Sequence, residues 1–181
     1  MRLLLIAFML ITLQGCVPTT RTAVTDVRAP LNQVMLDRAH KAMTLALLDA
    51  GFDLKQQDPT LRIVMTEYKK VDSVSGWPPF DFYLQIKAVV RDIPGSQDGE
   101  LAIWPKMKEQ NRLNQNAFTE HPLLWYSQQE TDDSNHMSTR AEAMRKGQAL
   151  FQSFLQSVAD RLGLPVDALH HSTKPLDVLG M

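Results

Sequence analysis

Apolar residues recur with two different spacings along the 181-residue chain, and the two spacings predict a mixture of helices and strands. Between residues 31 and 50 they return every third or fourth position, which places them on one face of a helix: Leu36, Ala39, Met43, Ala46, Leu47 and Ala50. Asn32 is positioned to cap the start of this helix, and Gly51 followed by Phe52 is typical of a Schellman end. We therefore expect an amphipathic helix over residues 31–50.

A second stripe with helical spacing covers residues 139–162 and consists of Met144, Gly147, Phe151, Phe154, Leu155, Val158 and Leu162. Thr139 and Glu142 fit a capping box at its start. Gly163, with Pro165 two residues later, predicts its end. This segment is the second predicted helix.

The clearest alternation of apolar and polar residues covers residues 80–92, where the apolar set is Phe80, Phe82, Leu84, Ile86, Ala88 and Val90. A spacing of two over this length predicts a strand with one buried face and one mostly wet face. The turn-forming residues 94–99 and the apolar run 101–104 complete a predicted antiparallel hairpin. Shorter apolar runs predict strands at 61–68, with a possible extension to Val71, and at 123–127.

This order of elements predicts an α+β fold, with a mostly antiparallel sheet of about four strands and two amphipathic helices packed on one face. Four segments lack a clear spacing of apolar residues and are predicted to be links or loops: 53–59, 73–79, 106–121 and 128–135. Residues 164–181 predict a C-terminal tail.

The N-terminus combines Arg2, an apolar run from Leu3 to Leu13 and a small residue before Cys16, as secretory signal peptides do. The apolar run is too short for a membrane-spanning helix, which needs about 20 residues. The segment Leu13-Gln14-Gly15-Cys16 resembles the lipobox of bacterial lipoproteins, although Gln14 is larger than the usual residue there. An ordinary signal peptide with an incidental cysteine is the alternative.

The lipobox resemblance implies cleavage between Gly15 and Cys16 and acylation of Cys16, and Val17 in place of aspartate implies the outer membrane. We therefore expect a signal peptide at 1–15, a lipidated N-terminus and tether at 16–30, a periplasmic domain at 31–163 and a tail at 164–181. A short strand at 23–27 fits the end of the tether. The acyl chains would be the contact with the membrane.

Charge and cysteine content exclude several function classes. With 19 Lys and Arg against 20 Asp and Glu, the chain lacks the basic excess of a nucleic-acid-binding protein. Its single cysteine excludes an intrachain disulfide framework and any multi-cysteine zinc site. His170 and His171, with Asp167 or Asp177 nearby, lack a third ligand at a diagnostic spacing and are typical of a solvated tail. We expect no metal and no cofactor.

Catalytic signatures are equally weak, because no Gly-x-Ser-x-Gly elbow is present. Glu130, Asp132 and Asp133 could in principle cleave glycans, but a solvated loop explains these carboxylates better. We therefore expect a protein that is not an enzyme. Aromatic residues beside prolines suggest a partner surface instead, formed by Trp77, Pro78, Pro79, Trp104, Trp125 and Tyr126. The alternative is that these rings only close the core and the sheet edges.

Over roughly residues 31–162, the order of elements resembles the YajG-like lipoproteins and the auxiliary lipoproteins of ABC-type envelope transporters. The resemblance rests on the helix ending in Asp49-Ala50-Gly51-Phe52, the strand at 61–68, the long strand at 80–92 and the late helix. It implies a lipid-anchored, non-catalytic accessory or binding subunit of an envelope complex for transport, secretion or assembly. A carrier of a lipid or small apolar ligand, and a cell-wall glycan hydrolase, are the alternatives.

Overall fold

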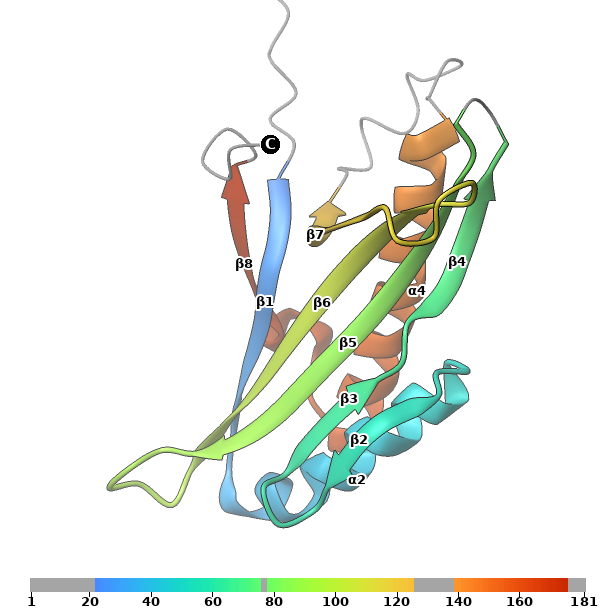
Figure 1. Ribbon diagram of the computed structural model, residues 1–181. Helices are drawn as coiled ribbons and strands as arrows, with labels where there is room; N and C mark the ends of the chain where they lie inside the picture. The colour runs from blue at the N-terminus through green and yellow to red at the C-terminus, as the bar shows by residue number, and fades with distance from the viewer. Residues whose placement is uncertain (1–21, 76–77, 126–138, 176–181) are drawn as a thin grey trace, which may run out of the picture.

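Residues 22–75, 78–125 and 139–175 are described by a computed structural model of the chain (Figure 1). The described residues form eight strands, two α-helices and one short 3-10 helix. In chain order these are β1 (Thr22–Leu31), α2 (Gln33–Asp49), β2 (Leu54–Asp58), β3 (Ile63–Thr66), β4 (Lys69–Val74), β5 (Phe80–Asp92), β6 (Gly99–Asn111), β7 (Phe118–Trp125), α4 (Thr139–Leu162), η1 (Val166–Ala168) and β8 (His170–Pro175).

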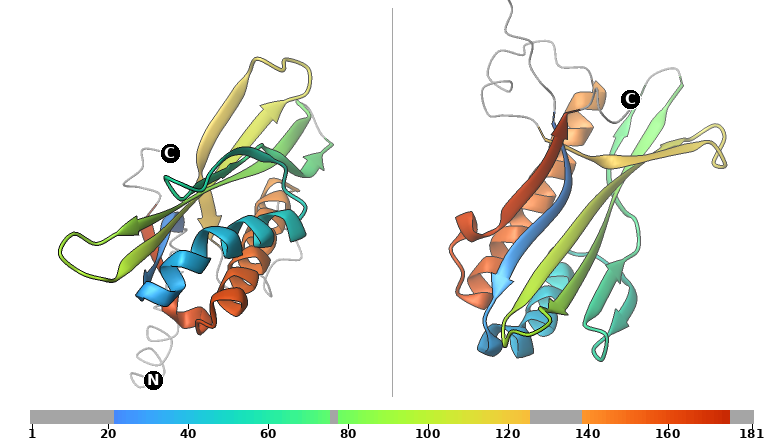
Figure 2. Two further views of the ribbon diagram at one scale, coloured as in Figure 1. Left: turned by 90° about the horizontal axis from the view of Figure 1, so that it is seen from below. Right: turned by 90° about the vertical axis from the view of Figure 1, so that its left-hand side faces the viewer.

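All the strands join one antiparallel sheet in the order β2-β3-β5-β6-β7-β1-β8, and β4 pairs with β5 beside β3. Both helices lie on the same face of this sheet, and no element of the described residues covers the other face (Figures 1 and 2). The β6–β7 turn bends away from the helical layer (Figure 2). The predicted α+β class and the placement of two helices on one face are confirmed.

The central pair β5 and β6 runs in unbroken register from Phe80 opposite Asn111 to Asp92 opposite Gly99. The prediction of a long strand at 80–92 is therefore confirmed. β6 is much longer than the predicted 101–104. The prediction ended too early because the helix-facing positions after Trp104 hold Pro105, Met107 and Glu109. A proline and a glutamate among the inward positions hide the alternation that would have marked the strand.

Both helices form where their apolar stripes predict. At the start of α2, the side-chain oxygen of Asn32 accepts a hydrogen bond from the Met35 amide at 3.0 Å. At its end, Gly51 has a φ of 72°, and the Phe52 amide donates to the Leu47 carbonyl at 3.0 Å, as a Schellman end requires. Lys69 from β4 donates to the Ala50 and Gly51 carbonyls, so the sheet also holds this end of the helix.

The second helix, α4, ends in the same way, since Gly163 has a φ of 70° and the Leu164 amide donates to the Ala159 carbonyl at 2.9 Å. The predicted capping box depends on the Thr139 side chain, which lies outside the described residues. None of the helices in the described residues is long and apolar enough to cross a membrane.

The core fills the space between the sheet and the two helices. Phe151 and Phe154 of α4 are fully buried, with ring centroids 6.1 Å apart. The largest side chains that share full burial with them include Phe82, Met43, Leu47, Leu84, Ile86, Leu101, Ile103 and Met107. Each apolar side chain of this size contributes about 1.5–3 kcal/mol when fully buried. This layer is therefore the main source of stability.

The prediction of about four strands is wrong, because the sheet has eight. The described residues of the predicted tether contain β1, which pairs with β6, β7 and β8. The predicted tail contains β8, and the predicted link at 53–59 contains β2, whose residues are half-buried or exposed. β2 and β8 carry few apolar residues of their own and are stabilised by pairing with β3 and β1. β1 does bury apolar residues, but the register shift between Val24 and Asp26 interrupts their alternation.

Two other predicted boundaries also change. The expected strand at 61–68 contains only β3, and its possible extension to Val71 falls in a separate strand, β4, which pairs with a different half of β5. The segment 106–121, predicted as a loop, contains the end of β6 and the start of β7. The strand predicted at 123–127 is the end of β7, and its last two residues lie outside the described part of the chain.

Candidate functional site

The face of the sheet opposite the helices, here called the open face, is the candidate functional surface. Along β5 and β6 it consists of six directly opposed residue pairs: Asp81 with Gln110, Tyr83 with Lys108, Gln85 with Lys106, Lys87 with Trp104, Val89 with Ala102, and Arg91 with Glu100. Four of these twelve residues are Lys or Arg and two are acidic. The open face therefore has an excess of cations, whereas the whole chain has a net charge of -1.

The first feature of the open face is a cluster of Trp104 with Lys87 and Arg91, here called the Trp104 cluster. The Lys87 ammonium lies 5.9 Å from the centroid of the Trp104 ring, and the Arg91 guanidinium lies 5.2 Å from it. Both cations are exposed and Trp104 is half-buried. These contacts hold a large aromatic ring between two positive charges, an arrangement that a partner's carboxylates and apolar groups can meet together.

The second feature is a cluster around Lys108, here called the Lys108 cluster. Its ammonium lies 4.7 Å from the Phe118 ring centroid, 5.5 Å from that of Tyr68 and 5.8 Å from that of Tyr83. The aromatic residues come from β7, the segment between β3 and β4, and β5, so three separate parts of the chain build it. Lys108 lies four positions after Trp104 on β6, which corresponds to about 13 Å along a strand.

The acidic residues near these clusters already have partners. Glu120 pairs with Lys106 and accepts a hydrogen bond from the Tyr68 hydroxyl, and these contacts lower the pKa of the Glu120 carboxyl. Glu100 pairs with Arg28 at 3.4 Å. By contrast, within the described residues Lys87, Arg91 and Lys108 contact aromatic rings and form no ion pair.

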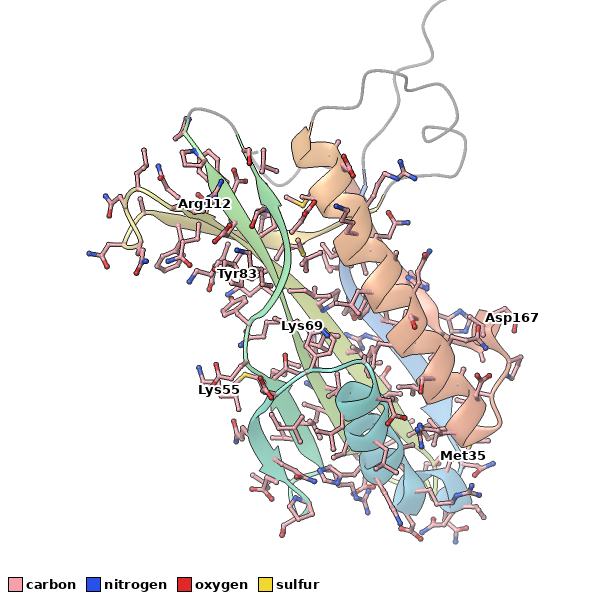
Figure 3. The ribbon with its side chains drawn as sticks, turned by 90° about the vertical axis from the view of Figure 1, so that its right-hand side faces the viewer. Met35, Lys55, Lys69, Tyr83, Arg112 and Asp167 are labelled. Carbon is pink, nitrogen blue, oxygen red and sulfur yellow. The ribbon has the colours of Figure 1, made fainter. Side chains whose placement is uncertain are left out.

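A polar cavity of about 340 Å³ lies at the end of the open face near the β6–β7 turn, lined by Asp81, Tyr83, Gln110, Asn111, Arg112 and Gln115. Figure 3 shows Tyr83 and Arg112 on the side of the sheet away from α4. The Asp81 carboxylate pairs with Lys70 at 3.0 Å and accepts a hydrogen bond from Ser73 at 2.8 Å. Burial alone would raise the pKa of Asp81, but these two contacts outweigh burial and lower the pKa.

The predicted partner surface is only partly brought onto the open face. Trp104 lies there, whereas the exposed Pro78 and half-buried Pro79 are next to the β6–β7 turn, where the Arg112 amide donates to the Pro79 carbonyl at 3.0 Å. Asn111 lies seven positions after Trp104 on β6, which separates the two places by about 23 Å. The structure therefore does not bring Trp104 and these prolines together. Trp77 and Tyr126 lie outside the described residues, as does the Trp125 side chain.

Other sequence candidates are placed as follows. His170 and His171 belong to β8 opposite Arg28 and Val27, and they are not in a loose tail. His121 is not in a loop as predicted but is buried in β7, with Nδ1 2.9 Å from the Pro122 carbonyl oxygen. Across residues 22–75, 78–125 and 139–175, no group of three His, Cys, Asp or Glu side chains gathers that could hold a metal. Gly15, Cys16, Glu130, Asp132, Asp133 and Asp177 lie outside the described residues.

Sequence reasoning recognised Trp104 but missed the cations that flank it. The alternation in β5 could have placed Lys87 and Arg91 on its wet face together with Tyr83. The contact of Lys108 with Phe118 and Tyr68 depends on the positions of β7 and of the segment between β3 and β4. No local sequence signal reports those positions.

No protein-family model matches the sequence, and no curated protein matches it. A crystal structure of a TBP-like protein from Parabacteroides distasonis is similar with a TM-score of 0.38 and 9% identity, covering 82% of this chain and 97% of that one. A DUF4468 family protein from Bacteroides ovatus also has a TM-score of 0.38, with 14% identity and coverage of 83% and 91%. Both likenesses are too distant to carry a function to this chain.

Proposed function

We propose that the chain is a lipid-anchored, non-catalytic binding subunit of a cell-envelope complex for transport, secretion or assembly. Its anchor is Cys16 in the outer membrane, its domain faces the periplasm, and its open face contacts a protein partner. The anchor is supported by the lipobox resemblance of residues 13–16. The binding role is supported by the form of the open face.

The observation that carries the binding role is the Trp104 cluster. Lys87 and Arg91 lie against the indole ring and, within the described residues, have no carboxylate partner. Tryptophan and arginine are enriched among the residues that dominate protein–protein binding energy. A partner segment with acidic side chains beside an apolar group would match both the charge and the ring.

The core gives no comparable support to the carrier alternative. The space between sheet and helices is occupied by fully buried side chains such as Phe82, Phe151 and Phe154. The 340 Å³ cavity is lined by polar and charged side chains. Its lining favours a polar ligand over an apolar one.

Photo-crosslinking in cells tests the open face. A photoreactive residue in place of Trp104 should capture a specific envelope protein, whereas the same residue in place of Lys41, exposed on α2, should not. The double change Lys87→Glu and Arg91→Glu should reduce the binding of that partner by at least tenfold, since two charges that meet acidic groups are reversed. The matched double change Arg38→Glu and Lys41→Glu on α2 should leave it unchanged. Equal capture from both positions would count against the proposal.

Membrane fractionation tests the anchor separately. The protein should sediment with membranes, and the Cys16→Ala variant should move to the soluble fraction because it cannot be acylated. Equal solubility of the two proteins would end the lipoprotein interpretation. It would leave the open face as a binding surface of a protein that has no acyl anchor.

A further inference from the structure

The β6–β7 turn and the first residue of β7 carry large apolar side chains that face solvent. Leu113 is 61% exposed and Phe118 is 53% exposed. The turn bends away from the helical layer, so neither α2 nor α4 covers it (Figure 2). Apolar groups gathered on a projecting turn are typical of a surface that another phase or molecule covers.

Positive charges are in excess around this turn. Residues 110–119 contain no aspartate or glutamate, while Arg112 is within the turn and Lys108 contacts the Phe118 ring. Three acids lie nearby: Glu109 is buried on the helical face, Glu120 pairs with Lys106, and Asp81 pairs with Arg112 at 3.6 Å. Asp81 also pairs with Lys70 at 3.0 Å, so this one acid is shared between two cations and a positive excess remains. Apolar and aromatic side chains with cations beside them form the composition that binds at the surface of an anionic bilayer.

The turn lies toward the end of the molecule where β1 begins (Figure 1). Six Cα–Cα steps join Cys16 to Thr22. Each step spans at most about 3.6 Å, so the start of β1 can lie no further than about 22 Å from the anchor. The 13 residues of β5 span about 43 Å, which exceeds that reach. A lipid at Cys16 would therefore keep this end of the domain near the bilayer.

We propose that the β6–β7 turn is a second membrane contact, in which Leu113 and Phe118 enter the headgroup region and Arg112 and Lys108 meet anionic lipid phosphates. This inference rests on the proposed lipid anchor and adds an orientation to it. The acyl chains would provide the affinity, and the turn would determine which end of the domain faces the bilayer. The Trp104 cluster lies about 13 Å from Lys108 along β6. It would then stay outside the headgroups and be available to a partner.

Site-directed labelling of the full-length, acylated protein in vesicles tests this orientation. Acylation consumes the single natural cysteine, so an introduced cysteine is the only free thiol. Leu113→Cys labels the turn, and Leu61→Cys is the matched control, because Leu61 is 60% exposed in the turn between β2 and β3 at the opposite end of the sheet (Figure 1). Each thiol receives an environment-sensitive dye, and quencher-bearing lipids report contact with the bilayer.

In phosphatidylethanolamine–phosphatidylglycerol vesicles, we expect the dye at position 113 to be quenched several-fold more than the dye at position 61. Equal quenching at the two positions would overturn the second contact, and so would the absence of quenching in protein that floats with the vesicles. A protein partner would then be the remaining occupant of the turn. Acylated protein that fails to float would instead refute the anchor, and this inference would fail with it.

The Phe118→Asp change, made in the protein labelled at position 113, isolates the contribution of the turn. It should reduce quenching at least twofold while flotation stays complete, because the acyl chains remain. Leu61→Asp in the same labelled protein is the control and should change neither measurement. Replacing phosphatidylglycerol by phosphatidylcholine should also reduce quenching, and equal quenching in the two lipids would overturn the role of Arg112 and Lys108.

Discussion

The two faces of β5 contrast sharply although their residues alternate along one strand. The helix-facing residues Leu84 and Ile86 are fully buried and apolar. Their neighbours Tyr83, Gln85 and Lys87 are half-buried or exposed and reach out from the open face. The first set excludes water from the core, and the second makes hydrogen bonds and cation–aromatic contacts at the surface.

This difference separates the side of the strand that stabilises the fold from the side that we propose to bind a partner. Apolar burial is the dominant favourable term in folding, and it falls almost entirely on the helix-facing side of the sheet. The open face adds contacts worth only about 0.5–1 kcal/mol each at exposed sites. Its residues can therefore serve recognition with little cost to the fold. Substitutions on the two faces should differ accordingly.

The largest effect is expected from Ile86→Ala, which removes a fully buried side chain between the sheet and the helices. It should lower the free energy of unfolding by about 2–5 kcal/mol, because apolar contacts are lost and a cavity remains. Urea denaturation measures this as a lower midpoint with an unchanged slope. The adjacent Lys87→Ala change should cost no more than about 1 kcal/mol. Equal losses at the two positions would break the contrast between the faces.

Gly99→Ala should cost roughly 1–3 kcal/mol, because the helical side of the sheet has no space for an added methyl group there. A Cβ at Gly99 would overlap the Leu36 side chain of α2 and lie 2.5 Å from the Arg91 carbonyl oxygen. Thermal unfolding should show a lower midpoint. Gln97→Ala, in the exposed turn between β5 and β6, should change stability by less than about 0.5 kcal/mol. An unchanged midpoint for Gly99→Ala would mean that α2 moves freely against β6.

Asp81→Asn probes the paired acid at the edge of the open face. The pKa of Asp81 is lower in the folded chain than in the unfolded chain. Its carboxylate therefore stabilises the fold at pH values above the unfolded pKa. This contribution is lost as the pH falls through the folded pKa. The variant should therefore be less stable by about 1 kcal/mol at neutral pH, and the difference should narrow in acid.

Urea unfolding at a series of pH values measures the Asp81→Asn difference. Asp37→Asn, which removes the same charge from an exposed position on α2, should change stability by less than about 0.5 kcal/mol. A difference for Asp81→Asn that stays constant down to acid pH would show that its charge contributes nothing to the fold.

The smallest effect on stability is expected from Lys108→Met, which keeps most of the side-chain stem but removes the charge from three aromatic contacts. It should cost about 0.5 kcal/mol in urea denaturation. A loss as large as that of Ile86→Ala would show that the open face is part of the stabilising core. Such a result would remove the basis for separating the two faces.

Much of the fold could be predicted because its signals are local. The start of α2 at Asn32, its end at Gly51 and the alternation of β5 each depend on residues close together in the chain. The candidate site was less accessible. Trp104 is visible as an aromatic residue in a strand, but its contacts with Lys87 and Arg91 require the register between β5 and β6.

The sequence by itself determined the two helices, the long central strand and the candidate anchor at Cys16, since each is encoded by a short pattern of size, polarity or capping. Only the tertiary structure decided that β2 and β8 join the sheet and that β1 continues to Leu31, because strands with few apolar residues, such as β2 and β8, are stabilised by hydrogen bonds to their neighbours in the sheet. The Lys108 cluster likewise forms only in the folded chain, because its rings come from three separate segments. Contacts between segments far apart in the chain leave no periodic trace in either segment, so they appear only when the chain is folded.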